Sequence, residues 1–281
     1  MSKIAIVTDS TAYLPEDLLK EYNIHVLPLK VIWGEESFDD GVDMTPTEFY
    51  ERLGTSDVMP STSQVTIGEF AQLFQKLHSE GKEILAILIS NGLSGTVASA
   101  VKAKEEVPEA KIELVDSKTT IAELALQVLI GARAAQTGAS LEECKTAVEN
   151  TRDKSGVVFA VDTLEFLHRG GRIGGGKRFL GTVLAIKPIL TLTDGKVDAL
   201  EQARTRKKSM ARLVEIVAER VEGKNNVRLG VSHAKSLKDA QALLELAQSL
   251  NPVETIISEI SPVIGTHVGP GTLALAYQFE E

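Results

Sequence analysis

Three polar runs in the sequence carry residue types that suit the binding of one anion. They are Pro60–Gln64, Asn91–Thr96 and Gly265–Gly271. We expect the first two to lie just before helix N-termini, where unpaired N–H groups and the helix dipole favour a negative charge. We expect the third to be an irregular loop, because it is rich in glycine and proline, that presents one threonine and one histidine. Hydroxyls, amides and an imidazole, without clustered Lys or Arg, predict a carboxylate site, although each run alone is also typical of turns.

The segment Gly171–Lys177 has the glycine and lysine spacing of a phosphate-binding loop. Its next residue is Arg178, whereas that loop needs a Ser or Thr hydroxyl to hold magnesium. The segment also follows a predicted helix, whereas a phosphate loop joins a strand to a helix. We therefore interpret it as a helix C-terminus and a flexible loop, and we expect no nucleotide cofactor.

A hydrolase triad of Ser94, His267 and an aspartate such as Asp116 is the main rival hypothesis. Its nucleophile would normally sit in G-x-S-x-G, whereas the sequence has Gly92-Leu93-Ser94-Gly95-Thr96. A serine at the start of a helix more often caps it or donates to an anion. A third hypothesis is a sensor whose two domains close on a small polar metabolite. The five histidines show no paired spacing, so we expect no metal site.

The composition narrows the class of protein. The 281 residues are 43% hydrophobic but only 5% aromatic, so the core is mostly aliphatic. A net charge of −9 disfavours nucleic acid as a partner. The one cysteine, Cys144, excludes an internal disulfide, and we expect it in the buried face of a helix. No apolar stretch approaches the roughly 20 residues of a membrane span, and the N-terminus lacks a signal peptide pattern, so we expect a cytoplasmic protein without stable membrane insertion.

Short apolar runs alternate with helical patterns over residues 1–155, which predicts an N-terminal α/β domain with a parallel sheet. Capping boxes at Thr45, Thr66 and Ser140 mark helix starts. The predicted strands are Ile4–Val7, His25–Trp33, Ile84–Ile89 and Ile112–Val115.

Residues 156–281 predict a second, α+β domain. Asp194-Gly195 between two apolar runs is typical of a hairpin. An amphipathic helix is predicted over 206–221, a closing strand over Thr272–Phe279, and a short helix capped by Asp162 with Glu165. The two domains are expected to face each other across a crevice.

Six segments, in their order along the chain, resemble the DegV family of bacterial fatty acid-binding proteins. The resemblance covers residues 3 to about 279, and it departs from the family at Val65, where proline is common, and at Gly174–Gly176, where bulkier residues are usual. The segments are Thr8–Thr11, Thr62–Gln64, Gly92–Thr96, Asp116-Ser117, Asp162–Ile173 and Ile264–Gly271.

The resemblance implies a two-domain DegV-like fold with the ligand between the domains. It also implies a carrier, not an enzyme, that binds a long-chain fatty acid and presents the carboxylate to a separate fatty acid kinase related to dihydroxyacetone kinases. The kinase forms an acyl phosphate with ATP for phospholipid synthesis, with an acyltransferase as a possible further partner. Arg204 and Arg206 would contact the kinase, although a basic run before a helix is usually a solvated face.

The resemblance also implies roles for the residues at the head group. Thr62 and Ser94 match side chains that hydrogen-bond the carboxylate. Thr266 and His267 match a loop that supports the same group, and Arg172 matches an arginine of the polar network around it.

A long acyl chain requires a narrow aliphatic tunnel. Burying about fifteen methylenes is worth roughly 0.8 kcal/mol each before ordering costs. The expected lining comes from the C-terminal domain, although each of these residues is equally typical of ordinary core packing. They are Phe166, Leu167, Phe179, Leu180, Val183, Leu184 and Ile186.

Overall fold

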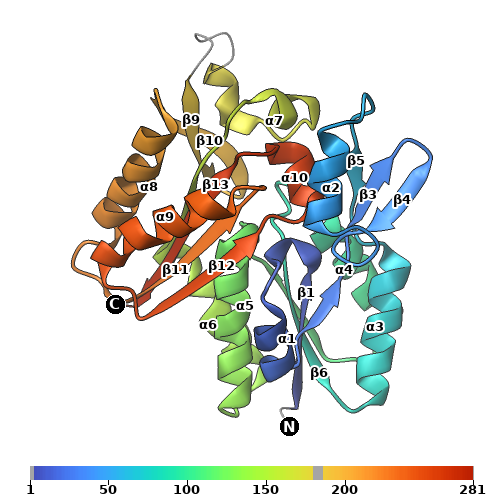
Figure 1. The fold of residues 1–281 in the computed structure, drawn as a ribbon. Coiled ribbons are helices and arrows are strands. Elements are labelled where there is room, and N and C mark those ends of the chain that lie inside the picture. Colours follow the sequence, from blue (N-terminus) through green and yellow to red (C-terminus); the bar gives the residue numbers. More distant parts are fainter. Residues whose placement is uncertain (1–2, 180–185, 281) are drawn as a thin grey trace.

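The computed structural model describes residues 3–179 and 186–280, which form three β-sheets and their flanking helices (Figure 1). The first sheet is parallel and has the order β2-β1-β6-β7, as the N-terminal pattern predicts. Its strands are β1 (Ile4–Asp9), β2 (His25–Leu27), β6 (Glu83–Leu88) and β7 (Ile112–Asp116). The helices of this half are α1 (Glu16–Tyr22), α3 (Ile67–Ser79), α4 (Thr96–Glu106), α5 (Ile121–Gln136) and α6 (Leu141–Glu149).

The second sheet has six strands in the order β10-β9-β8-β13-β11-β12, and only β11 and β12 pair in parallel. The predicted hairpin is confirmed: Asp194 and Gly195 join β9 to β10 with φ of 49° and 74°. The helix predicted over 206–221 is α8 (Arg206–Val221). The other elements are β8 (Ser155–Ala160), β9 (Lys187–Thr193), β10 (Lys196–Ala203), β11 (Asn225–His233), β12 (Glu254–Glu259), β13 (Leu273–Glu280), α7 (Glu165–Arg169), α9 (Leu237–Ala247) and α10 (Pro262–Val268).

A third, antiparallel sheet has the order β4-β3-β5 and was not predicted. It contains β3 (Lys30–Trp33), β4 (Glu36–Asp39) and β5 (Ser61–Ser63), and α2 (Pro46–Leu53) connects β4 to β5. The single strand predicted over His25–Trp33 is wrong, because Pro28 separates β2 from β3. Proline has no N–H to donate to a ladder, so the chain leaves the first sheet there and enters the third.

Local signals predicted most helix starts correctly. The capping boxes of Thr45, Thr66 and Ser140 are all formed. The cap predicted at Asp162 is wrong: α7 has Leu164 at its N-cap, and Asp162 instead accepts a bond from Lys187 at 2.7 Å. Among the described residues, no helix combines the length and apolar character of a membrane span.

Helix α5 joins the two larger sheets. Twelve of its sixteen residues are buried, which is typical of a helix covered on every side. A Cβ on Gly131 would lie 2.9 Å from Ile87 in β6, and one on Gly230 in β11 would lie 2.6 Å from Ala122. The helix therefore packs tightly on both sides, and one apolar core continues across residue 155. The domain boundary at 155/156 stays a prediction.

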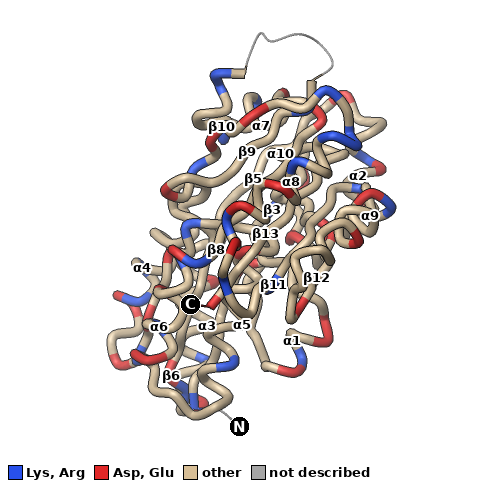
Figure 2. Tube along the Cα trace, turned by 90° about the vertical axis from the view of Figure 1, so that its left-hand side faces the viewer, with Lys and Arg blue, Asp and Glu red and all other residues tan. Residues whose placement is uncertain are grey.

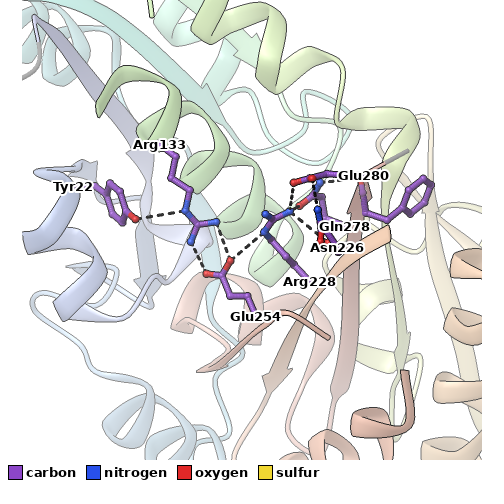
Figure 3. Close-up of polar contacts among 8 residues, drawn as sticks. Tyr22, Arg133, Asn226, Arg228, Glu254, Gln278 and Glu280 are labelled. Carbon is purple, nitrogen blue, oxygen red and sulfur yellow. Dashed lines mark hydrogen bonds and ion pairs between the residues drawn. The ribbon is translucent and has the colours of Figure 1, made fainter. Parts of the chain in front are cut away.

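A partly buried ionic network also connects the two halves (Figure 3). Arg133 of α5 forms a bidentate pair with Glu254 at the start of β12, with distances of 2.8 and 2.6 Å. Glu254 also pairs with Arg228 of β11 at 3.3 Å, and Arg228 pairs with Glu280 of β13 at 2.9 Å. Nε of Arg133 reaches the Tyr22 hydroxyl at 3.5 Å. The network thus joins α1 and α5 to three strands of the second sheet.

Replacing Glu254 by glutamine should lower the free energy of unfolding by about 1–3 kcal/mol, because two part-buried guanidinium groups lose their shared carboxylate. Urea denaturation followed by the fluorescence of Trp33, the only tryptophan, measures the change. The matched control is Glu16→Gln, which breaks an exposed pair with Lys20 and should change the free energy of unfolding far less, because solvent screens that pair. Equal losses in the two variants would contradict the role of the network.

Candidate functional site

A cavity of about 210 Å³ lies between the two halves, and residues of both line it. Thirteen of its 22 lining residues are Leu, Ile, Val or Phe. Among the described lining residues there is no Asp or Glu, and Arg172 carries the one formal positive charge. The apolar lining is Leu29, Ile89, Leu93, Ile121, Val157, Phe159, Leu167, Leu192, Val197, Ile260, Val263, Ile264 and Val268. Such a cavity favours an apolar ligand with an anionic group.

Four of the five predicted head-group residues meet at this cavity. The hydroxyl of Thr62 lies 2.9 Å from Nε2 of His267. Oγ of Ser94 lies 2.9 Å from the hydroxyl of Thr96 and accepts a bond from the N–H of that residue at 3.3 Å. Arg172 is exposed and donates to the carbonyl of Leu93 at 3.2 Å, which ties the segment after α7 to the loop before α4. Two hydroxyls, one imidazole and one guanidinium therefore come together from four segments.

Thr266, the fifth predicted residue, is not among the lining residues that the structure describes. Its hydroxyl donates to the carbonyl of Pro262 at 3.0 Å, four residues earlier in α10. Because neighbouring residues of a helix point about 100° apart, Thr266 and His267 do not face the same side. The prediction treated this segment as a loop, which is wrong.

The helix α10 forms because Pro262 occupies its first position and Ser261 caps it. The glycines Gly269 and Gly271, with φ of 74° and 82°, then end it. The first polar run precedes α3 as predicted, since that helix starts at Ile67. The run also contains a strand that was not predicted, because Thr62 lies in β5. The second run does precede a helix, with Gly95 at the N-cap of α4.

Buried carboxylates that the sequence did not single out position the site. Asp9 accepts a bond from the N–H of Ile89 at 2.7 Å and so fixes the start of the loop that carries Ser94. Asp40 accepts from the hydroxyl of Ser10 at 2.6 Å and from the N–H of Val263 at 3.1 Å. Asp40 therefore holds the N-terminus of α10, and burial raises the pKa of its carboxyl to about 6. Asp9 lies in a family-like segment, but nothing in the sequence indicated its partner.

Gln64 connects the first two polar runs. Its Nε2 donates to the carbonyl of Gly95 at 3.2 Å and to the hydroxyl of Ser99 at 2.8 Å. The sequence placed Gln64 in a polar run without giving it a role. The structure shows that it fixes the end of β5, and hence Thr62, against the loop of Ser94.

His267 lies in an environment that keeps its ring neutral. Burial, and then the charge of Arg172, lower the pKa of His267 to about 4. Its Nδ1 is buried and accepts no hydrogen bond. A neutral ring that donates from Nε2 to Thr62 leaves the hydroxyl proton of Thr62 for another acceptor. A carboxylate in the cavity would be such an acceptor.

The hydrolase arrangement is not formed. Among the described residues, the hydrogen bonds of Ser94 and His267 go to Thr96 and Thr62, and none joins Ser94 to His267. Asp116 accepts bonds from two backbone N–H groups and pairs with Lys118 at 2.9 Å. The described residues also contain no group of three His, Cys, Asp or Glu side chains that could hold a metal.

The predicted apolar lining is largely different from the observed one. Of the described candidates only Leu167 lines the cavity, whereas Phe166 packs against Gly269. Phe179 and Ile186 are described but are not among the lining residues. Leu180, Val183 and Leu184 lie outside the described residues.

The glycine-rich run that resembles a phosphate loop has a packing role. Gly174–Phe179 forms a 3-10 helix against β10. A Cβ on Gly174 would lie 2.1 Å from the carbonyl of Val197, and one on Gly175 would lie 2.1 Å from the carboxylate of Asp198. Gly174 and Gly175 therefore have no room for a side chain, because β10 lies against their backbone.

Comparison with known proteins assigns the family. The family model described as "Uncharacterised protein, DegV family" matches residues 3–280. The chain belongs to the DegV family. A DegV domain-containing protein of Clostridium perfringens is 36% identical over 281 residues, which cover 99% of each chain.

Solved structures of the family have the same mixed α/β fold. A DegV family protein from Thermus thermophilus, described by its fatty acid binding, is 35% identical, with a TM-score of 0.94 and full coverage of both chains. DegV of Bacillus subtilis, described as a fatty acid binding protein, is 32% identical, with a TM-score of 0.90 and full coverage of both chains.

The environment of His267 predicts a pH dependence of stability. The imidazole has a pKa near 6.5 when unfolded and about 4 when folded, so only the unfolded state takes up a proton between these values. The stability advantage of the wild type over His267→Gln should therefore be complete above pH 6.5 and fall by up to about 3 kcal/mol towards pH 4. Denaturant titrations of both proteins at several pH values measure this difference. A difference that does not change with pH would contradict the assignment.

Proposed function

We propose that this chain binds one long-chain fatty acid, with the carboxylate at Thr62 and Ser94 and the acyl chain in the cavity. The observation that carries the proposal is the distribution of polarity around the cavity. Apolar side chains form most of the wall, and the described lining contains one cation and no acidic group. DegV neighbours described as fatty acid binding, at 35% and 32% identity, support the same ligand class.

The two parts of such a ligand have different tasks. An acyl chain of about fifteen methylenes gains roughly 12 kcal/mol in gross burial energy, before ordering costs. The hydroxyls of Thr62 and Ser94 would orient the carboxylate, and neutral donors bind it without the desolvation cost of a second buried cation. The apolar wall thus supplies affinity, and the polar end supplies orientation.

We further propose that the chain is a carrier rather than an enzyme, and that it presents the carboxylate to a separate ATP-dependent kinase for acyl phosphate formation. Arg172 is exposed at the polar end of the cavity, where a partner could reach it. Arg204 is exposed as well. Arg206 is less available, because it pairs with Asp239 at 2.8 Å and donates to the carbonyl of Gly271. Acidic and basic segments are interspersed along the chain (Figure 2). The distribution of charge alone therefore does not indicate which surface would contact the kinase.

The first test is binding of octadecanoate to the double variant Thr62→Val with Ser94→Ala. Loss of two donors to a charged group should weaken binding about 10- to 100-fold while the fold is kept. Displacement of a fluorescent fatty acid measures the affinity. The control is Thr55→Val with Ser79→Ala, which removes two exposed hydroxyls away from the cavity. Unchanged affinity in the first variant would refute the assigned roles.

The second test concerns the carrier role. With a fatty acid kinase and ATP, the wild-type chain loaded with octadecanoate should yield acyl phosphate, and the double variant should yield far less at equal loading. Acyl phosphate formed from ATP by this chain alone would overturn the carrier role. Ester hydrolysis that disappears in Ser94→Ala would instead favour the hydrolase.

A further inference from the structure

Thr120, a residue of the cavity wall, has a buried hydroxyl without a hydrogen-bond partner. The residue is only 8% exposed. It enters the wall from the loop between β7 and α5. No described hydrogen bond connects its side chain to Thr62, Ser94 or His267, so this hydroxyl is separate from the polar end already described.

The lack of a partner is unusual for this position. Thr120 is the N-cap residue of α5, and it makes no capping bond. The N-cap hydroxyls of Thr45, Thr66, Ser140 and Thr205 each accept a bond from the backbone N–H three residues later. Ser236, the N-cap residue of α9, makes no capping bond either, but its hydroxyl donates to the carbonyl of Ala234. A capping bond typically stabilises a helix by about 1 kcal/mol. The hydroxyl of Thr120 therefore lacks the backbone N–H partner that an N-cap hydroxyl ordinarily has.

The backbone around Thr120 is held firmly. The carbonyl of Thr119 accepts a bond from the N–H of Ser90 at 2.8 Å, and the hydroxyl of Thr119 donates to Glu123 at 2.5 Å. Ile121, the next lining residue, has a φ of +51°, which a β-branched residue rarely adopts. Strained backbone of this kind persists where the surrounding structure enforces it, and it clusters at functional sites.

The side chain of Thr120 can turn without losing a bond. When χ1 of a threonine rotates by about 120°, the hydroxyl can take the place of the methyl group, which then takes the place of the Hβ atom. Because Oγ1 has no hydrogen-bond partner, such a rotation gives up no hydrogen bond and can offer the hydroxyl to an acceptor in the cavity. A plain methylene chain offers no acceptor, whereas an oxygen atom on the chain does.

We propose that Thr120 is a specificity-determining residue that favours a long-chain acid with an oxygen substituent, a hydroxyl or keto group, on its acyl chain. This inference rests on the proposed binding of a fatty acid and adds the chemical class of that acid. Beside a plain chain the hydroxyl stays unpaired, and beside an oxygenated chain it pairs. Because a buried hydroxyl without a partner is costly, the preference should be about tenfold.

The test compares the affinities of octadecanoate and of its 3-, 10- and 12-hydroxy derivatives for the wild type and three variants. At least one hydroxy acid should bind the wild type about tenfold more tightly than octadecanoate. Thr120→Val should abolish this preference, and Thr120→Ser, which keeps the hydroxyl, should retain it. The matched control is Thr272→Val, since Thr272 also lines the cavity but its hydroxyl already contacts the carbonyls of Val268 and Gly269 at 3.0 Å each. The control should lower stability and leave the preference unchanged.

The outcomes separate this inference from the proposed function. Binding of octadecanoate with no preference for any hydroxy acid would overturn the role of Thr120 and leave the carrier intact. A preference that survives in Thr120→Val would overturn it equally. If Thr120→Val does not fold, Thr120→Ala takes its place with the same expected loss. No binding of any of the four acids by the wild type would refute the proposed function itself.

Discussion

The contact between Thr62 and His267 is the interaction on which the site depends, because it joins segments 205 residues apart at the polar end of the cavity. The contact exists only if β5 and α10 are placed independently against each other. Asp40 holds the N-terminus of α10, and Gln64 fixes the end of β5 against the loop of Ser94. Some polar side chains in and around the cavity therefore position the few groups that would touch a ligand.

The electrostatics of the cavity limit what it can hold. A part-buried neutral imidazole, two hydroxyls and one exposed guanidinium suit one negative charge, and the apolar wall excludes a second. Burial keeps His267 neutral, and in the tautomer with its proton on Nε2 the ring donates to Thr62, whose own proton is then available to a ligand. The same burial makes the unpaired hydroxyl of Thr120 significant, since an unpaired polar group costs most where water is absent.

Local features were predicted well from the sequence, and features that depend on distant contacts were not. The capping boxes of α2, α3 and α6 and the span of α8 follow from residues within each helix. The third sheet could not be predicted, because β3 pairs with β5 across β4 and α2, and because Pro28 divides an apolar run that reads as one strand. Thr266 was misplaced because its orientation depends on the helical phase of α10, which a run rich in glycine and proline does not reveal. The apolar wall was missed for a similar reason: it is assembled from both halves, and ordinary core residues have the same pattern.

The proposed function requires that one fatty acid occupies the cavity of each chain. Native mass spectrometry of the purified protein, mixed with octadecanoate and sprayed gently, tests it most directly. We expect a shift by the mass of one acid per chain, with no further shift when the acid is in excess. A spectrum that keeps the unliganded mass, or one that shows a ladder of several acids without saturation, would contradict it.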